Sequence, residues 1–183
     1  MKKLLTFLGT RKYDCINYYF NKKDKRISYK SKYIQVALNK LIFKNLNCDY
    51  RKVIVFATSK ARDANWDSSD EKLKDELIEM GLVEGKSFEK IEIKDGENES
   101  ELWENFEIIC NQFEDGDEVY IDITNSLRSI PLIFMAILNY ISVVKDNVKI
   151  KGIYYGAYEL GEKGIDNKIE SAPIIDLTMF ITL

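Results

Sequence analysis

The sequence contains no histidine, and this absence excludes several classes of catalytic and metal site. Without an imidazole, the chain cannot carry Ser-His-Asp or Cys-His catalysis, or a zinc site that uses histidine. Nuclease or deaminase chemistry that depends on a histidine ligand, acid or base is excluded as well. A reaction on this chain would therefore need other side chains, or geometry alone.

Cysteine is also scarce in the sequence. Cys15, Cys48 and Cys110 are odd in number and widely separated, and no two of them form a CxxC pair. This usage is typical of reduced, mostly buried thiols in a cytoplasmic protein, and not of a disulfide framework or a metal site. We therefore expect no metal and no cofactor.

Long apolar runs are few. Lys2 and Lys3 precede a run at residues 4–8 that resembles a signal peptide, but the run is too short for one. Residues 130–144 form the longest apolar stretch, which falls short of the roughly 20 residues that span a bilayer. We expect a core helix there, and neither secretion nor membrane insertion.

No charge of one sign dominates, since 27 Lys and Arg residues face 30 Asp and Glu residues, for a net charge of −3. A general nucleic-acid binder needs a broad basic face, so the chain is not expected to bind long nucleic acids. If it binds phosphates, it binds a few of them in a local site. Its length suits a single domain, residues 1–183, with a sizeable core.

Apolar strands alternate with amphipathic helices along the chain. We expect buried strands at residues 3–8, 53–57 and 118–123, and a strand of weak alternation at residues 88–93. One hairpin is expected from 18–20 and 26–29, around a turn at 21–25, and another from 148–155 and 169–175. Helices are expected after Ser31, after Ser68 with Glu71 as a capping box, after Asn98 with Glu101, and from about Arg128 to Val144.

This order of elements predicts the fold class. Strands that alternate with helices imply crossover connections and a mainly parallel sheet. We therefore expect an α/β, Rossmann-like, doubly wound domain with helices on both faces and a C-terminal β-hairpin. Ligands bind such sheets at the carboxyl ends of the strands, where the winding reverses. Three segments that follow predicted strands are candidates: 9–13, 58–66 and 122–129.

Segment 122–129, with the sequence DITNSLRS, is the strongest local signal. It leads from a buried strand into a buried helix, so its backbone N–H groups are expected at a helix N-terminus, which favours anions. Thr124, Asn125 and Ser126 add short polar side chains, and Arg128 adds a forked cation for a phosphate or a base. The alternative, common at such turns, makes Asn125 or Ser126 a simple N-cap and Arg128 a solvent-facing residue.

Segment 9–13 carries a weaker signal. Gly9, Thr10, Arg11 and Lys12 place a small residue, a hydroxyl and two cations directly after the first predicted strand. Such a loop lets the backbone approach an anion, but a single glycine is far less specific than a GxGxxG motif. A plain surface turn explains the same residues.

Segment 58–66 is also ambiguous. Thr58, Ser59, Asn65 and Trp66 place hydroxyls, an amide and an aromatic ring after the second predicted strand. Trp66 would either stack on a nucleobase or lie in the core, which is the usual place of tryptophan. Asp122, at the end of the fourth strand, lacks a second carboxylate neighbour and is therefore a poor metal ligand.

Together these segments resemble the CRISPR-associated Rossmann-fold (CARF) family, in particular the branch with a D-x-T-H-[GS]-F-R-S-x-P signature. The residues that match are Asp122, Thr124, Ser126, Arg128, Ser129 and Pro131, with Leu127 for the aromatic residue; residues 5–10 with Tyr13; Thr58, Ala61, Asn65 and Trp66; residues 153–157 with Glu159; and Pro173 with Asp176, Leu177 and Thr178. Asn125 stands where the signature has histidine, and asparagine cannot gain a charge. The likeness extends over nearly the whole chain in the same order.

The resemblance implies the sensor domain of a type III CRISPR antiviral effector, which binds a cyclic oligoadenylate, most often the four-nucleotide ring, across a homodimer. The chain would be the sensor part of a longer protein, or a sensor by itself, and ligand binding would activate an attached effector domain allosterically. The ligand-binding residues that this implies are Gly9, Thr10, Arg11, Lys12, Tyr13, Thr58, Ser59, Asn65, Trp66, Asp122, Thr124, Asn125, Ser126, Leu127, Arg128, Ser129, Gly156, Ala157, Tyr158 and Glu159.

Two other functions stay open at this point. The chain could be a ring nuclease that cleaves the bound cyclic oligoadenylate by 2′-hydroxyl attack, without a metal, with Arg11, Lys12 and Ser126 as the catalytic candidates. It could also be a Rossmann-type nucleotide-binding regulator unrelated to CRISPR. The missing glycine fingerprint of dinucleotide-binding domains weakens that last hypothesis.

Overall fold

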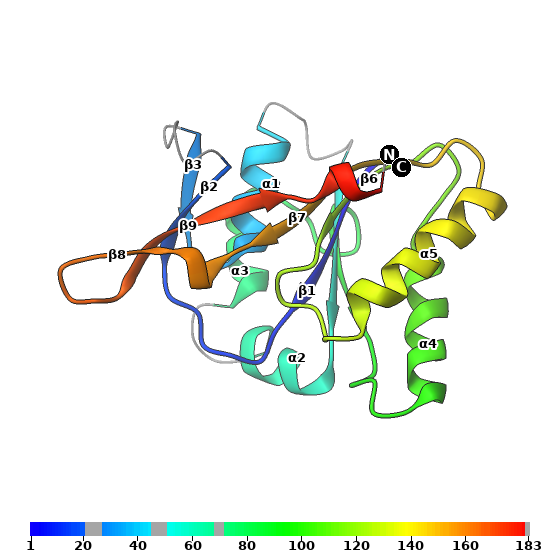
Figure 1. The fold of residues 1–183 in the computed structure, drawn as a ribbon, viewed down its shortest axis with the longest axis horizontal. Coiled ribbons are helices and arrows are strands. Elements are labelled where there is room, and N and C mark those ends of the chain that lie inside the picture. The colour runs from blue at the N-terminus through cyan, green and yellow to red at the C-terminus, as the bar shows by residue number, and fades with distance from the viewer. Residues whose placement is uncertain (21–26, 45–50, 68–71, 182–183) are drawn as a thin grey trace.

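A computed structural model describes residues 1–20, 27–44, 51–67 and 72–181 of the chain. Within these ranges, one sheet runs through the molecule in the order β3-β2-β9-β7-β6-β1-β4-β5, and β8 pairs with β9 away from this path (Figure 1). The fold is α/β and Rossmann-like, as the alternation of elements predicts.

Five parallel strands form one side of the sheet. β1 (Lys2–Leu8) pairs with β4 (Arg51–Ala57) on one side and with β6 (Glu118–Asp122) on the other. β5 (Phe88–Glu92) continues the sheet beyond β4, and β7 (Lys149–Gly156) continues it beyond β6. Since these strands run in the same direction, their carboxyl ends share one edge of the sheet, which is where ligands bind such folds.

The other side of the sheet is antiparallel in part. β9 (Ile169–Asp176) runs antiparallel to β7, which confirms the predicted C-terminal hairpin, and β8 (Glu162–Lys163) pairs with β9. β2 (Ile16–Tyr19) is parallel to β9 and antiparallel to β3 (Ser28–Ser31). The N-terminal hairpin is therefore confirmed, although its predicted turn lies outside the described residues.

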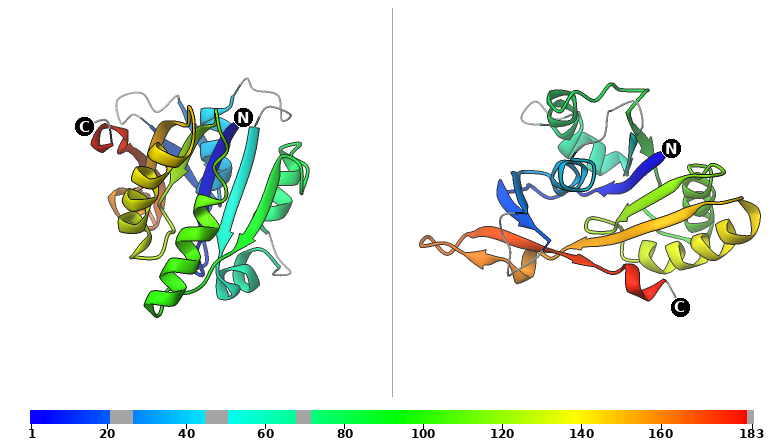
Figure 2. Two further views of the ribbon diagram at one scale, coloured as in Figure 1. Left: turned by 90° about the vertical axis from the view of Figure 1, so that its right-hand side faces the viewer. Right: turned by 90° about the horizontal axis from the view of Figure 1, so that it is seen from above.

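Helices cover both faces of the sheet (Figure 2). α1 (Ile34–Ile42) and α3 (Leu73–Glu79) bury apolar residues against one face, with Val36, Leu38, Leu73 and Leu77 in the first core cluster. α4 (Glu99–Cys110) and α5 (Ile130–Val144) pack on the opposite face, and their apolar residues form a second cluster with those of β1, β4 and β6. The doubly wound arrangement is thus confirmed, with one core cluster on each side of the sheet.

The predicted helix starts are only partly correct. Asn98 caps α4, and its Oδ1 accepts a hydrogen bond from the Glu101 N–H at 3.0 Å, as the sequence predicts. The prediction for Ser31 is wrong, because Tyr33 is the N-cap of α1 and the Ser31 hydroxyl instead accepts from the Tyr33 N–H. The capping box at Ser68 and Glu71 lies outside the described residues.

One helix was not predicted. α2 (Ser59–Asn65) follows β4 directly, and Thr58 is its N-cap, with the Thr58 hydroxyl accepting from the Ala61 N–H at 3.3 Å. Among its seven residues only Ala61 and Asn65 are buried, so the segment lacks the apolar periodicity that identifies a helix in sequence. Thr58 is therefore capping a helix, and its hydroxyl is engaged within the fold.

The cysteines are not uniformly buried. Cys110 is buried, and burial raises the pKa of its thiol to about 11. Cys15 is exposed, which contradicts the expectation for that residue, and Cys48 lies outside the described residues. In the described part of the chain, no set of three or more acidic or thiol side chains is grouped as a metal would require, and no helix has the length and apolar content needed to cross a membrane.

Candidate functional site

The loops after β1, β6 and β7 meet at the carboxyl edge of the sheet and enclose an open cavity of about 290 Å³. Most of its lining was predicted from sequence, because parallel strands end at a common edge. The residues that line it are Gly9, Thr10, Arg11, Thr124, Asn125, Ser126, Tyr155, Gly156, Tyr158 and Glu159. We call this the strand-end cavity.

A buried carboxylate organises the floor of the site. Asp122 is fully buried, and its Oδ2 accepts from the Thr6 hydroxyl at 2.6 Å while its Oδ1 accepts from the Thr124 N–H and hydroxyl. The Thr124 hydroxyl in turn accepts from the Gly156 N–H at 2.8 Å. Burial raises the pKa of Asp122, and the hydrogen bonds from Thr124 and Thr6 oppose that rise. Asp122 therefore ties β1, β6 and β7 together under the cavity and does not face it.

Two glycines allow the loops of the cavity to approach each other closely. The Gly9 N–H donates to the Tyr13 hydroxyl at 2.9 Å, and a Cβ on Gly9 would lie 2.6 Å from that oxygen. A Cβ on Gly156 would lie 2.0 Å from the Ile34 Cδ1 atom and 3.3 Å from the Thr124 hydroxyl. Any larger residue at either position would displace these neighbours, so the shape of the cavity depends on both glycines.

Arg11 is the cation of the cavity. Its guanidinium lies 5.1 Å from the centre of the Tyr158 ring and 5.5 Å from that of Tyr13, so it makes cation–π contacts with two aromatic rings. The Tyr158 hydroxyl donates to the Asp14 carboxylate at 3.0 Å. Lys12 and Tyr13 line a second, smaller cavity of about 70 Å³ next to Arg11, and they do not line the strand-end cavity itself.

Tyr155 is a lining residue that the sequence analysis did not select. Its hydroxyl donates to the Glu159 Oε1 atom at 2.5 Å, and this hydrogen bond, together with burial, raises the pKa of Tyr155 to about 12. The available signal was its place beside Gly156 at the end of a predicted strand. The neighbouring Ala157 was selected but is fully buried, with its N–H bound to the Pro173 carbonyl.

The turn after β6 differs from the predicted helix start. α5 begins at Ile130 with Ser129 as its N-cap, and Ser129 makes no side-chain capping bond. The Ser126 hydroxyl and N–H both donate back to the Ile123 carbonyl, at 2.9 and 3.3 Å. Neither Asn125 nor Ser126 therefore caps α5, which corrects that expectation. Both side chains line the cavity from a turn that precedes the helix.

The end of the same segment lies outside the cavity lining. Leu127 is partly buried and packs against the second core cluster. Arg128 is exposed and does not line the strand-end cavity, and Ser129 is part-buried at the start of α5. The structure thus separates Thr124, Asn125 and Ser126 from the three residues that follow them.

The segment after β4 supports the site from within the fold. The Asn65 amide is buried and donates to the carbonyls of Gly9 and Arg11, at 2.9 and 3.0 Å. Trp66 is 3% exposed and packs on Phe88 in the core, with ring centres 6.0 Å apart. The interpretation of Trp66 as a core residue therefore fits its position, and base stacking does not. Ser59 is exposed at the start of α2 and does not line the cavity.

A Rossmann-like sheet whose strand ends converge on an open polar cavity defines a class of ligand-binding domains. Residues 3–159 of the chain match the family described as the CARF domain of the CRISPR system endoribonuclease Csx1, and the chain belongs to this family. It is also 43% identical over 89 residues to a CRISPR-associated protein, MJ1674, of Methanocaldococcus jannaschii. That match covers 47% of this chain and 13% of the relative, so the chain corresponds to a small part of the relative's length.

Proposed function

We propose that this CARF domain is the ligand sensor of a type III CRISPR effector and binds a cyclic oligoadenylate, with the four-nucleotide ring as its preferred ligand. The family membership supports a CRISPR role. The observation that carries the proposal is the strand-end cavity, where Arg11 and the polar turn at Thr124, Asn125 and Ser126 converge at the edge of the sheet. A few phosphates can be held there without a broad basic surface.

The charges of the cavity suggest how such a ligand is oriented. Arg11 supplies a forked cation that suits a phosphate. Glu159 would repel a phosphate, so it suits the parts of the ligand that donate hydrogen bonds, namely a ribose hydroxyl or the amino group of adenine. Arg11 and Glu159 both line the same cavity. We therefore propose that phosphates lie toward Arg11 and that sugars or bases lie toward Glu159.

The size of the cavity supports a shared site. Drug-sized ligands already occupy about 300–1,000 Å³, and the strand-end cavity measures about 290 Å³. A ring of four nucleotides is larger than one such cavity can enclose. A ring with internal two-fold symmetry suits two identical half-sites, so we propose that two copies of the domain each offer one strand-end cavity to one ring.

Binding is tested by calorimetry with cyclic tetra-adenylate, cyclic hexa-adenylate and linear tetra-adenylate. The proposal expects the cyclic tetramer to bind most tightly. Arg11→Ala is expected to weaken binding at least tenfold, while Lys163→Ala, which removes an exposed cation on β8, serves as the matched control. If neither ring binds, the proposed ligand class is wrong. Tighter binding of the hexamer would change the ring size and leave the sensor function standing.

A ring nuclease is the second candidate, because Arg11 and the Ser126 hydroxyl line the same cavity. In that reaction the 2′-oxygen of one ribose bonds to the adjacent phosphorus and the bond to the 5′-oxygen breaks. The 2′-hydroxyl proton ends on the departing 5′-oxygen, which leaves a 2′,3′-cyclic phosphate and a 5′-hydroxyl. Incubation of the protein with a labelled ring distinguishes the two functions. A linear product that the wild type forms and Ser126→Ala does not form supports cleavage. A ring that the wild type leaves intact supports a pure sensor.

A further inference from the structure

A second hollow of the surface lies between β3, at the edge of the sheet, and the helices α1 and α3. It encloses about 610 Å³, against about 290 Å³ for the strand-end cavity, and no residue lines both. Its lining includes three lysines, two carboxylates and a thiol, which belong to Lys30, Lys40, Lys72, Asp75, Glu79 and Cys15. We call this hollow the lysine cleft. It is separate from the site of the proposed function.

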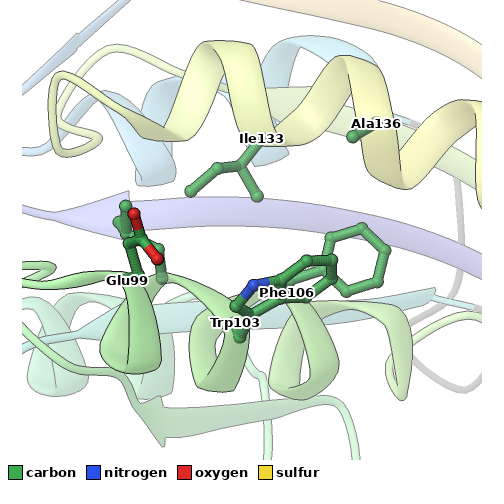
Figure 3. A pocket seen from close by; sticks show the side chains of 6 residues that line it. Glu99, Trp103, Phe106, Ile133 and Ala136 are labelled. Carbon is green, nitrogen blue, oxygen red and sulfur yellow. The ribbon is translucent and has the colours of Figure 1, made fainter.

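The lysine cleft differs in chemistry from the groove between α4 and α5, on the opposite face of the sheet. In that groove, Trp103 and Phe106 of α4 lie across from Ile133 and Ala136 of α5 (Figure 3). Glu99 is the one charged residue among those that line it. Such an apolar groove offers a polar ligand few partners. The lysine cleft, lined by charges of both signs, can bind a small charged ligand.

Three lysines of the cleft have ammonium groups that remain available. Lys30 on β3, Lys40 on α1 and Lys72 at the N-cap of α3 make no ion pair and no side-chain hydrogen bond with any residue in the described part of the chain. Lys74, two positions further along the chain, is by contrast paired with Glu84 at 2.6 Å. The three cleft lysines can therefore bind the anionic groups of a ligand without breaking a contact of the fold.

Two carboxylates of the cleft are available as well. Asp75 and Glu79 are four residues apart on α3, so they lie on one face of the helix, and both are exposed. Neither makes an ion pair or a side-chain hydrogen bond among the described residues. Glu76, between them, is engaged, since it accepts from the Ser31 hydroxyl at 3.0 Å. Free charges of both signs in one cleft suit a zwitterion, a ligand that carries both carboxylate and ammonium groups.

A buried amide beside the cleft lacks a hydrogen-bond partner. Asn39 of α1 is 0% exposed, and its Nδ2 atom donates to the sulfur of Met80, which lines the cleft, at 3.7 Å. The Asn39 Oδ1 atom has no partner among the described residues. Buried carbonyl oxygens are nearly always hydrogen-bonded. An N–H group of a ligand that reaches past the flexible Met80 side chain would supply the missing donor.

Cys15 adds a nucleophile to the cleft. Its thiol is exposed immediately before β2, whereas Cys110 is buried in the core. A thiolate attacks disulfides, and access to the thiol is a condition of that reaction. An exposed thiol among free charges of both signs therefore suits a disulfide whose two halves are zwitterionic.

We propose that the lysine cleft binds a small zwitterionic peptide disulfide, of which glutathione disulfide is an example, and that Cys15 exchanges with it. The Cys15 thiolate bonds to one sulfur of the ligand, and the ligand's S–S bond breaks. The departing half takes up the proton that Cys15 lost and leaves as a thiol, while the other half stays on Cys15 as a mixed disulfide. The ligand is the oxidant, and a cleft of about 610 Å³ has the size of a small-molecule site.

The first test identifies the thiol that reacts. The full chain is incubated with glutathione disulfide, and mass spectrometry of the intact protein and of its peptides counts and locates the attached groups. One group is expected on Cys15, removable by dithiothreitol and absent in Cys15→Ser. Cys48→Ser is the control and should react as the wild type does. Attachment elsewhere, with Cys15 unmodified, would overturn the proposal.

The second test distinguishes a binding cleft from a thiol that is merely exposed. The rates with glutathione disulfide and with neutral hydroxyethyl disulfide are each divided by the rate for free N-acetylcysteine, which removes differences in intrinsic reactivity. The wild type is expected to prefer glutathione disulfide about tenfold, and salt should weaken this preference. Equal relative rates for the two disulfides would overturn the cleft as a binding site.

Variants of the cleft show which charges recognise the ligand. The double variant Lys30→Ala with Lys72→Ala should lower the preference about fivefold, and Asp75→Asn about twofold, as expected for exposed ion pairs. Lys163→Ala, which removes an exposed lysine on β8, is the matched control and should leave the preference unchanged. A preference that survives in both cleft variants would contradict the assignment of these charges.

These tests are independent of the proposed function, because the two sites share no lining residue. If Cys15 exchanges with the expected charge preference and no cyclic oligoadenylate binds, the proposed function fails and the lysine cleft stands. If a cyclic oligoadenylate binds and Cys15 shows no preference between the two disulfides, the lysine cleft fails and the proposed function stands.

Discussion

Two segments that the sequence marks as strand-end candidates, 58–66 and 122–129, have different roles in the structure. The turn after β6 places Thr124, Asn125 and Ser126 at the lining of the strand-end cavity. The segment after β4 turns inward, so that Asn65 holds the loop after β1 from below and Trp66 lies in the core. Both segments match the family pattern, but only the first lines the strand-end cavity. A matching residue can thus serve a site by supporting its loops.

The difference between the lining segment after β6 and the supporting segment after β4 leads to a general expectation for substitutions. Changes in the supporting residues should lower the free energy of unfolding first and ligand binding as a consequence. Changes in the lining residues should lower ligand binding and leave the free energy of unfolding unchanged. The predictions below run from the largest expected effect on stability to the smallest.

Trp66→Ala should have the largest effect on stability. Trp66 is 3% exposed, and removal of a buried tryptophan costs about 3–5 kcal/mol of the free energy of unfolding. Trp103→Ala is the matched control, because Trp103 is 65% exposed and should lose less than about 0.5 kcal/mol. Urea denaturation of the two variants measures both values. Equal losses would contradict the assignment of Trp66 to the core.

Asp122→Asn should have an intermediate effect. In this variant an NH₂ group, which donates hydrogen bonds, takes the place of one carboxylate oxygen, which accepts from Thr6 or Thr124. We therefore expect a loss of about 1–3 kcal/mol in the free energy of unfolding at neutral pH. Asp176→Asn is the control, since Asp176 is exposed at the end of β9. A loss no larger than that of the control would contradict the buried network.

The same variant reveals the pH dependence of Asp122. Burial raises the pKa of Asp122 above its ordinary value of 3.8, so the folded protein holds this proton more tightly than the unfolded chain. The contribution of Asp122 to stability is therefore greatest below 3.8 and falls as the pH rises through the folded-state pKa. The stability of the wild type relative to Asp122→Asn should increase on acidification. A decrease would mean that the hydrogen bonds outweigh burial.

Arg11→Ala should have the smallest effect on stability and a large one on binding. Arg11 is exposed, and its contacts with Tyr13 and Tyr158 lie at the surface. Its removal should therefore change the free energy of unfolding by less than about 0.5 kcal/mol. Thermal unfolding without and with cyclic tetra-adenylate measures both properties. A stability loss as large as that of Asp122→Asn would place Arg11 among the supporting residues.

Much of the fold could be predicted from the sequence, because the strands are continuous apolar runs. The buried strands at β1, β4 and β6 and the hairpin of β7 with β9 fall within one or two residues of their predicted bounds. α2 was missed because it is short and mostly polar, and its only two buried residues are Ala61 and Asn65. Its helical form depends on the Thr58 cap and on its position beneath the loop after β1.

The site was only partly predictable, because its roles depend on contacts between distant segments. The common edge of the parallel strands correctly brings Arg11, Thr124 and Glu159 together. Asn125 and Ser126 have the residue types of helix caps, and only the bonds from Ser126 back to Ile123 show that the helix starts later. Likewise, the sequence cannot show that Asp122 faces Thr6, which is 116 residues away.

The absence of charged residues along α5 can be read from the sequence, but which faces of the helix are buried is known only from the structure. In sequence the stretch is a core helix, and its inner face is indeed buried. The exposure of Leu132 and Val143 shows that a second face remains open.

The most direct test of the central claim is the stoichiometry of cyclic tetra-adenylate binding to the wild-type protein, measured by calorimetry together with the oligomeric state. We predict one ring for every two chains, with binding weakened in Arg11→Ala while the dimer remains. A ring bound to each single chain, or no binding of any cyclic oligoadenylate, would contradict a site that two strand-end cavities share.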